Sequence, residues 1–236
     1  MSDILTMVWK ESKDVLFQGG WRSLVRPLIV VGIIGIYLPL QLGPQWVDLT
    51  PIGMILLLWI PYFMIISFIG DVIAGERERH TLETLLASRM PDRAILLGKV
   101  VSIIMYSWGM GVLSLLLGLV LVDLFSTQGI WMFYPLDLFL DAIVLGLLVS
   151  VLGASAGVLI SLRASTARQA QQILSVGTIV FVFGSIIALR AVPADVVSSL
   201  TYSQFLLVAM AVIAVLDALL LGLSLASFQR SRLILS

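Results

Sequence analysis

The sequence contains no cysteine and one histidine, His80, and these two scarcities exclude whole classes of function. Without cysteine there is no disulfide framework, no thiol nucleophile and no thiolate metal site. With one histidine, a metal centre built from several imidazoles is excluded as well. The chain also lacks a G-x-x-x-x-G-K-[ST] run, so it has no phosphate-binding loop of its own. We therefore expect no metal, no cofactor and no enzymatic activity in this chain.

Charge is scarce too, because only 12% of the 236 residues are charged while 60% are apolar. The mean hydropathy is +1.10. Soluble domains carry about 25% charged and about 45–50% apolar residues. A chain of this composition cannot cover itself with a water-compatible surface, which excludes a soluble enzyme, a disordered regulator and a nucleic-acid binder. The composition predicts an all-α integral membrane protein.

Six apolar stretches are long enough to cross a bilayer, because roughly 20 helical residues span the ~30 Å hydrocarbon layer. They are Leu24–Leu42, Ile52–Ala74, Val100–Val122, Leu138–Leu162, Ile173–Leu189 and Phe205–Phe228. We therefore expect a single transmembrane domain over residues 1–236, with six spans between residues 24 and 228.

The basic residues predict the orientation of these spans. Thirteen of the 14 lie before or at the start of the first span, in the loops after the second and fourth spans, or after the sixth. They are Lys10, Lys13, Arg22, Arg26, Arg77, Arg79, Arg89, Arg93, Lys99, Arg163, Arg168, Arg230 and Arg232. Only Arg190 lies in the opposite set of loops. Because basic residues are retained on the cytoplasmic side, both termini are expected there.

Residues 1–20 predict an amphipathic helix that precedes the first span. Its apolar residues fall at helical spacing, and its charged residues fall largely on another face. The apolar set is Leu5, Val8, Trp9 and Leu16, and the charged set is Lys10, Glu11, Lys13 and Asp14. Such a helix lies in the membrane interface with its apolar stripe against the acyl chains. It serves either as an anchor alone or as a regulatory element.

The loop over residues 75–99 holds nine of the 28 charged residues. Read as a helix, it aligns one charged face and one apolar face. The charged face has Glu76, Arg79, His80 and Glu83, and the apolar face has Leu82, Leu85 and Leu86. A loop that only enforces orientation needs positive charge rather than interleaved glutamates. The pattern therefore favours a docking surface for a cytoplasmic partner over a merely solvated loop.

This loop resembles the signature of the ABC type-2 exporter permeases, the membrane subunits of one class of ATP-binding-cassette transporter. The matching residues are Asp71, Gly75, Glu76, Arg77, Glu78, Arg79, Thr81, Leu82, Glu83, Leu85, Leu86 and the run from Ile95 to Lys99. His80 stands where the family usually has glycine. The loop over residues 163–172 looks like the family's second cytoplasmic loop.

The resemblance implies a permease that pairs with a second copy or a sister permease in a prokaryotic cytoplasmic membrane. Separate ATPase subunits, which carry the ATP and Mg²⁺, would dock below. The contact residues implied are Glu76, Arg77, Glu78, Arg79, His80, Thr81, Leu82, Glu83, Leu85 and Leu86, with Arg163, Arg168 and Gln171 from the second loop. Membrane lipids are the other expected partners, and nucleic acid is not.

Polar residues inside the spans raise two further possibilities. Ser155 lies in a G-x-S-x-G run, but a serine protease needs a base beside its serine and none is available at that depth. Small residues that let helices pack closely are the better interpretation. Asp71, Asp141 and Asp217 are candidates for the transport pathway or for hydrogen bonds between helices. Asp217, in the middle of the sixth span, also supports the alternative function of an ion-coupled secondary transporter.

Overall fold

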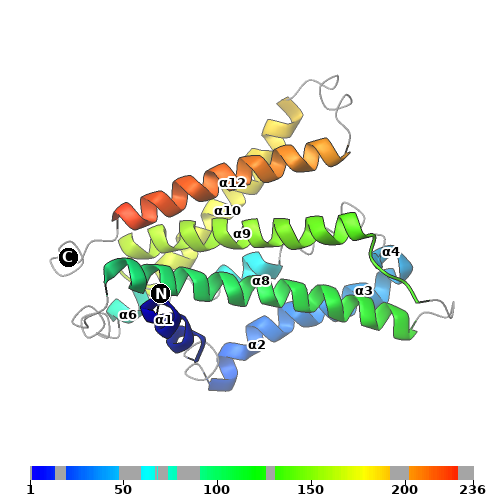
Figure 1. Ribbon diagram of the computed structural model, residues 1–236, viewed down its shortest axis with the longest axis horizontal. Helices are drawn as coiled ribbons and strands as arrows, with labels where there is room; N and C mark the ends of the chain where they lie inside the picture. Colours follow the sequence, from blue (N-terminus) through cyan, green and yellow to red (C-terminus); the bar gives the residue numbers. More distant parts are fainter. Residues whose placement is uncertain are drawn as a thin grey trace.

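The computed structural model describes residues 2–13, 20–47, 60–66, 68, 74–78, 91–125, 131–191 and 202–227. Regular secondary structure in these ranges is helical throughout (Figure 1). The helices are α1 (Ser2–Lys13), α2 (Gly20–Val31), the π-helix η2 (Gly32–Tyr37), α3 (Leu38–Leu42), α4 (Pro44–Val47), α6 (Ala74–Glu78), α8 (Asp92–Phe125), α9 (Leu136–Arg163), α10 (Ala167–Ala191) and α12 (Tyr202–Ser227). The all-α prediction is therefore confirmed for the described residues.

Among the described residues, three helices are long and apolar enough to cross a membrane. They are Ala94–Phe125, Leu136–Arg163 and Leu206–Ser227. The first two contain the third and fourth predicted spans, and the last covers all but the first and last residues of the sixth. The first predicted span corresponds to a shorter apolar helix, Pro27–Leu42. The fifth lies within α10, and most of the second lies outside the described residues, with helix at residues 60–66. Six spans thus remain a prediction.

Helix α8 begins earlier than the sequence predicted. The loop was expected to run to residue 99, but α8 starts at Asp92. Pro91 accepts backbone hydrogen bonds from Ala94 and Ile95 at 2.9 and 3.2 Å, and thereby starts the helix. No helix-breaking residue follows, so the helix continues into the span. Lys99 consequently lies inside a helix rather than in a loop.

The first apolar helix is continuous from α2 through η2 to α3 and lies against α8. A Cβ atom on Gly35, in η2, would lie 3.0 Å from Cβ and 3.1 Å from Cα of Ser114. The absence of a side chain therefore lets the π-helix approach the backbone of α8. The helix ends at Gly43, whose φ of 54° suits a residue without a side chain.

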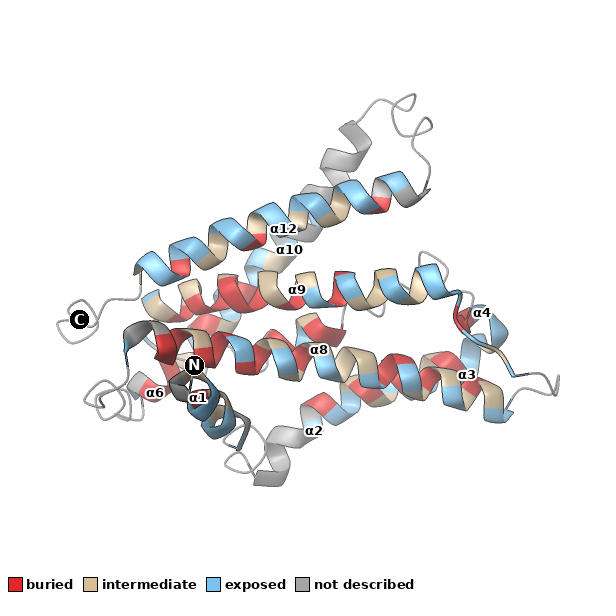
Figure 2. Ribbon diagram, viewed as in Figure 1, coloured by how far each residue is buried: buried red, intermediate tan, exposed pale blue. Residues whose placement is uncertain are grey.

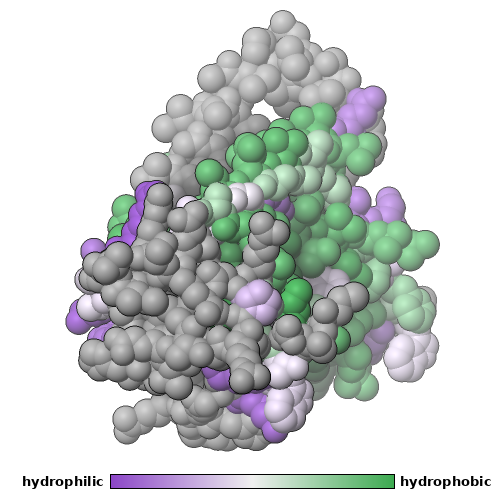
Figure 3. Space-filling view, turned by 60° about the vertical axis from the view of Figure 1, so that its left-hand side comes forward, coloured by the Kyte–Doolittle hydropathy of each residue, from purple (hydrophilic) through white to green (hydrophobic). Residues whose placement is uncertain are grey.

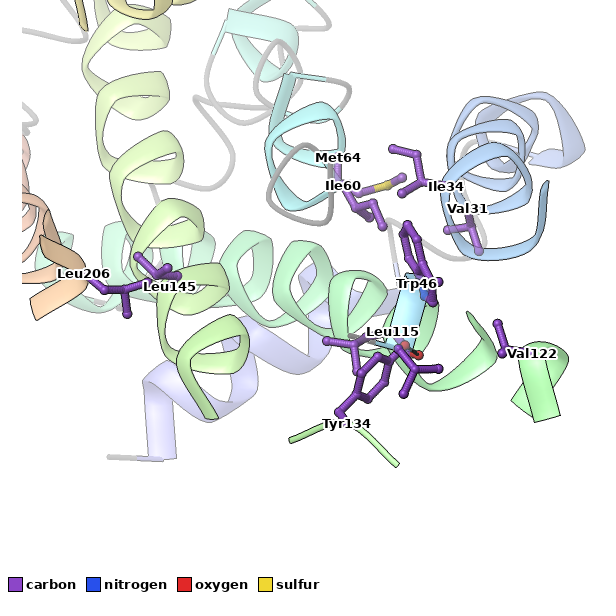
Figure 4. Packing of buried hydrophobic residues seen from close by; sticks show 11 residues of the cluster. Val31, Ile34, Trp46, Ile60, Met64, Leu115, Val122, Tyr134, Leu145 and Leu206 are labelled. Atoms are coloured by element: carbon purple, nitrogen blue, oxygen red, sulfur yellow. Dashed lines mark hydrogen bonds between the residues drawn. The ribbon is translucent and has the colours of Figure 1, made fainter. Parts of the chain in front are cut away.

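Trp46 of α4 fills the core at the end of the molecule where α8 ends and α9 begins (Figures 1 and 4). It is 1% exposed, and a Cβ atom on Gly118 of α8 would meet its indole Nε1. Tyr134 lies nearby, and its hydroxyl donates a 3.0 Å hydrogen bond to the carbonyl oxygen of Leu115. One buried cluster thus joins α4, α8 and the segment that leads into α9.

A second core cluster lies toward the opposite end of α8 and α9, where Figure 2 shows buried residues concentrated on these two helices. It includes Met7 of α1 and Ile65 of the helical segment 60–66. A Cβ atom on Gly153 would lie 2.7 Å from Cδ1 of Ile65, so this glycine allows a close helix contact. The prediction that small residues in the G-x-S-x-G run serve packing therefore has a direct structural basis at Gly153.

Buried and half-buried hydroxyl groups recur along the long helices and bond to the backbone of their own helix. Each donates to the carbonyl oxygen four residues earlier, at 2.5–2.9 Å. The residues are Ser102, Ser107, Ser114, Ser150, Ser155, Ser175, Thr178 and Ser224. Ser224 of α12 is also 3.2 Å from the carbonyl oxygen of Ser155 in α9. The interhelix contacts thus include polar groups that are satisfied locally.

The end of the molecule that carries α1 and α6 is the charged end, which we define by Glu11, Glu76, Glu78, Lys99, Arg163 and Arg168. Figure 3 brings this end forward and shows hydrophilic residues at its periphery, with hydrophobic surface along the helices behind. The contrast matches a bundle whose sides are apolar and whose end meets water.

Candidate functional site

Helix α6, at the start of the predicted docking loop, is held by three different helices. The amide of Ala74 donates a 3.0 Å hydrogen bond to Oγ of Ser161 in α9. Oε1 of Glu76 lies 2.8 Å from Nζ of Lys99 in α8. Oε2 of Glu78 accepts a 3.3 Å hydrogen bond from the amide of Ala167, the first residue of α10. This short helix is therefore fixed at both ends and in its middle.

Lys99 is the most buried charged side chain among the described residues, at 1% exposure. Its ammonium group lies between two carboxylates, Oε1 of Glu76 at 2.8 Å and Oε1 of Glu11 at 3.0 Å. Both carboxylate side chains are themselves largely covered, at 11% and 16% exposure. A buried ammonium is tolerated only with such partners, since an unpaired charge in this environment is strongly destabilising. The three residues therefore form one buried ionic cluster that joins α1, α6 and α8.

Helix α1 reaches this cluster because it packs closely on α8. Met7 is fully buried, and a Cβ atom on Gly98 would lie 2.5 Å from Cγ and 2.6 Å from Cβ of Met7. Oγ of Ser102 is 3.5 Å from the carbonyl oxygen of Val8, one turn further along α8. The missing side chain at Gly98 is what brings Glu11 within reach of Lys99.

The outward face of α1 carries Leu5 and Trp9, which are 67% and 64% exposed. The ammonium group of Lys13 lies 3.7 Å from the centre of the Trp9 ring. Exposed aromatic and basic side chains of this kind suit a membrane interface. The predicted apolar stripe does not face one way, because Leu5 and Trp9 face outward while Val8 is half-buried. The residue that packs on α8 is Met7, which was not assigned to the stripe. Leu16, also assigned to the stripe, lies outside the described residues.

The second predicted loop leads into the N-terminus of α10. Oγ1 of Thr166 accepts a 3.2 Å hydrogen bond from the amide of Gln169, while Oε1 of Gln169 accepts from Ser165. This reciprocal arrangement caps the helix. Arg163 and Arg168 are exposed on either side of the cap, and Gln171 is half-buried in the next turn. Through the bond from Ala167 to Glu78, the two predicted loops meet.

The structure places part of the predicted docking set. Glu76 and Glu78 are described, and so is the backbone of Arg77. The others lie outside the described residues: Arg79, His80, Thr81, Leu82, Glu83, Leu85 and Leu86. Glu76 is 8% exposed and faces Lys99, so its carboxylate is turned into the molecule rather than toward a partner.

Of the three predicted intramembrane aspartates, the structure describes two, and they lie in different helices. Asp217 is 5% exposed on α12, and its carboxylate makes no hydrogen bond within the part of the chain that the structure describes. It lies two helical turns before Ser224, whose hydroxyl contacts α9, and hence on the same face of α12. Asp141 is half-buried near the start of α9, and Asp71 lies outside the described residues.

Comparison with known families decides what this arrangement belongs to. The model of the ABC-2 type transporter family matches residues 2–202. The chain belongs to the ABC-2 type transporter family. The match begins in α1 and ends at the start of α12, so it includes the ionic cluster and both predicted loops.

An ABC-2 type transporter chain is the permease component of an ABC transporter, an integral membrane protein of transmembrane transport. Members of this family generally work with ABC ATPase partners. No curated protein matches the chain. The alternative of an ion-coupled secondary transporter gains no support from the family match.

Sequence reasoning missed the participation of Glu11, Gly98 and Lys99 in this site. A signal for Lys99 was present, because it is a single charge within the apolar run from Ile95 to Val101. Such a charge in a helix requires a buried partner. Nothing in the sequence indicated which acidic residues would supply it, since Glu11 is 88 positions away.

Proposed function

We propose that this ABC-2 permease forms the substrate pathway of an exporter and is driven by separate ABC ATPase subunits that dock at the charged end. The observation that carries the proposal is the fixed position of α6, which α8, α9 and α10 each hold through a hydrogen bond or an ion pair. An element fixed to three helices can transfer a push from below to all of them. ATP and Mg²⁺ belong to the ATPase in this scheme.

We further propose that residues 76–86 form the coupling segment, in which the members have different tasks. Glu76 and Glu78 position the segment, because their carboxylates bind Lys99 and the N-terminus of α10. The contacts to the ATPase then come from Arg77, Arg79, His80, Thr81, Leu82, Glu83, Leu85 and Leu86, with exposed Arg163 and Arg168 and half-buried Gln171 beside them. Contact with the ATPase and positioning of the coupling segment are thus assigned to separate side chains.

The pathway itself is proposed to lie between two permeases, either two copies or this chain and a sister chain. Within one chain, the cleft between α8, α9 and residues 60–66 has a volume of only about 20 Å³. That space holds about one water molecule, which is far too small for a transported substrate. Asp217 is buried on the α12 face that contacts α9, so we propose that within one chain it faces a neighbouring helix rather than a pathway.

The docking proposal is tested by purifying the permease with a co-expressed ABC ATPase. Replacing Arg79 and Glu83 by alanine should release the ATPase, because both belong to the proposed contact face. Arg190→Ala is the matched control, since Arg190 is predicted on the opposite side of the membrane. Retention of the ATPase by the double variant, at the level of the control, would place the docking surface elsewhere.

The orientation is tested by single cysteines in a chain that has none of its own. Trp131→Cys is placed at the end opposite the charged end, where Trp131 is 74% exposed, and Arg163→Cys is placed at the charged end. A membrane-impermeant maleimide added to intact cells should label position 131 and not position 163. The reverse pattern would overturn the proposed topology and a plasma-membrane permease with cytoplasmic termini.

A further inference from the structure

The buried ionic cluster of Glu11, Lys99 and Glu76 connects two elements that lie far apart in the sequence. The family match gives only a range of residues and no contact between these elements. One is α1, whose outer face is apolar and aromatic. The other is α6, which begins the proposed coupling segment. Lys99 contacts both, through Glu11 of α1 and Glu76 of α6.

Packing fixes the α1 side of this connection. Gly98 permits Met7 to lie directly on α8, and Ser102 contacts the carbonyl oxygen of Val8. These contacts set the axial position of α1, and Glu11 follows Met7 by one helical turn on the same face. The packing of α1 on α8 therefore places the Glu11 carboxylate beside Lys99.

The α6 side is fixed by one ion pair between two hydrogen bonds. The amide of Ala74 and the carboxylate of Glu78 hold the two ends of α6, while Glu76 contacts Lys99 between them. Oppositely charged groups at 2.8–3.0 Å in a largely buried site attract each other strongly and resist separation. A displacement of α6 therefore draws Lys99 and, through it, Glu11.

We propose that Lys99 is a positioning residue that makes α1, α6 and the first turns of α8 move as one body when the ATPase acts. This inference rests on the proposed function, because it assigns the linkage through which the coupling segment reaches α1. Helix α1 thus belongs to the moving part of the transporter, and its membrane-facing residues Leu5 and Trp9 are carried along the interface. Breaking the pair between Lys99 and Glu76 disconnects ATP hydrolysis from movement of α8, whereas breaking the pair between Lys99 and Glu11 releases α1 from the moving part. Neither change removes the ATPase.

Charge exchange within the cluster allows each ion pair to be broken separately. In E11K/K99E the pair between α1 and α8 is kept with reversed sign, whereas residue 99 now repels Glu76. In E76K/K99E the pair between α6 and α8 is kept, whereas residue 99 repels Glu11. In E11K/E76K/K99E both pairs are restored with all signs reversed, so this triple variant is the matched control.

Two spin-label pairs report on the consequences, in complexes with the ATPase in lipid nanodiscs. Labels at Leu5→Cys and Met105→Cys measure the position of α1 on α8, since both side chains are more than half exposed. Labels at Met105→Cys and Val215→Cys measure movement of α8 relative to α12 when ATP and vanadate are added. Vanadate-sensitive ATP hydrolysis and ATPase co-purification are measured in parallel.

The inference predicts a selective pattern. E76K/K99E broadens the distance distribution between α1 and α8, whereas E11K/K99E leaves it narrow. Both double variants retain the ATPase and hydrolyse ATP. E11K/K99E loses the nucleotide-dependent change between α8 and α12, because residue 99 repels Glu76, whereas E76K/K99E keeps that change. The triple variant regains the narrow distribution and the nucleotide-dependent change. A full nucleotide-dependent change in E11K/K99E, its loss in E76K/K99E, or its absence in the triple variant overturns the inference.

A neutral triple variant, E11Q/E76Q/K99M, decides the question if the double variants do not fold. It removes every charge of the cluster, so no buried group is left unpaired. The inference expects it to fold and bind the ATPase but to show no nucleotide-dependent change, whereas a normal change would reduce Lys99 to a structural residue. If the wild-type chain binds no ABC ATPase, the proposed function fails, while the effect of the charge exchanges on the α1 position still tests the role of Lys99.

Discussion

The close contact of α1 with α8 at Gly98 yields a prediction whose size follows from the structure. A Cβ atom at position 98 would lie 2.5 Å from Cγ and 2.6 Å from Cβ of Met7. Carbon atoms pack at about 3.5–4.0 Å, so G98A forces the two helices apart by roughly 1 Å. The Cγ atom can move by a change of rotamer, but the Cβ atom moves only with the backbone of α1.

The energetic cost is isolated by a second alanine substitution in the same helix. A Cβ atom at Gly109 would meet nothing within 4 Å, so G109A gains helix propensity without a clash. That gain is up to about 1 kcal/mol and applies to both variants, so it cancels in their comparison. Overpacking costs about 1–3 kcal/mol, and G98A is therefore expected to be less stable than G109A by about this amount. For a chain of this size the difference corresponds to a melting temperature lower by roughly 2–12 °C.

Thermal unfolding in detergent and the label pair at positions 5 and 105 provide the assay. G98A should melt below G109A, and the distance between α1 and α8 should increase by roughly 1 Å or become broader. Adding M7A should relieve part of the loss, because it removes Cγ, the nearest atom, but keeps Cβ. If G98A melts with G109A and leaves the label distance unchanged, the contact between Gly98 and Met7 does not set the position of α1.

Three further predictions concern other contacts. Gly35→Val should destabilise the protein by about 1–3 kcal/mol because its side chain meets the backbone of Ser114, whereas Gly32→Ala, with nothing within 4 Å, should not; thermal unfolding compares them. Thr166→Ala removes the cap of α10 and should cost about 1 kcal/mol in the same assay, with Thr166→Ser retaining most of the stability. Burial raises the pKa of Tyr134, so the native state holds this proton at a pH where the unfolded chain has lost it. Stability should therefore fall as pH rises above about 10, and Tyr134→Phe should lessen that fall; parallel pH profiles would refute this.

The sequence predicted the class of fold and the helices of the long spans because these depend on local composition. Apolar runs placed the spans within α8, α9 and α12, and their ends differed by a few residues where capping decided. Pro91 begins α8 well before the apolar run does, which only the backbone hydrogen bonds reveal. The charge alternation in the predicted docking loop likewise indicated that Glu76 and Glu78 belong to a functional segment.

The tasks of these glutamates could not be predicted, because they depend on contacts between distant parts of the chain. A glutamate on an amphipathic segment is equally suited to a partner and to a buried lysine, and only the path of α8 decides that Glu76 faces Lys99. The role of Gly98 is similar, since it is one of 19 glycines and only its neighbour Met7 distinguishes it. Long-range pairing is the information that composition and spacing do not contain.

The hydroxyl groups that bond to their own helices have a consequence for how the spans can slide. Ser224 shares its hydroxyl between the carbonyl oxygens of Leu220 in its own helix and Ser155 in α9. When the two helices shift in register, the hydroxyl releases the neighbour and keeps the bond one turn back, so no donor is left unsatisfied in the membrane. Such side chains stabilise the contact between the helices in one arrangement and leave no unpaired donor when the helices move to another.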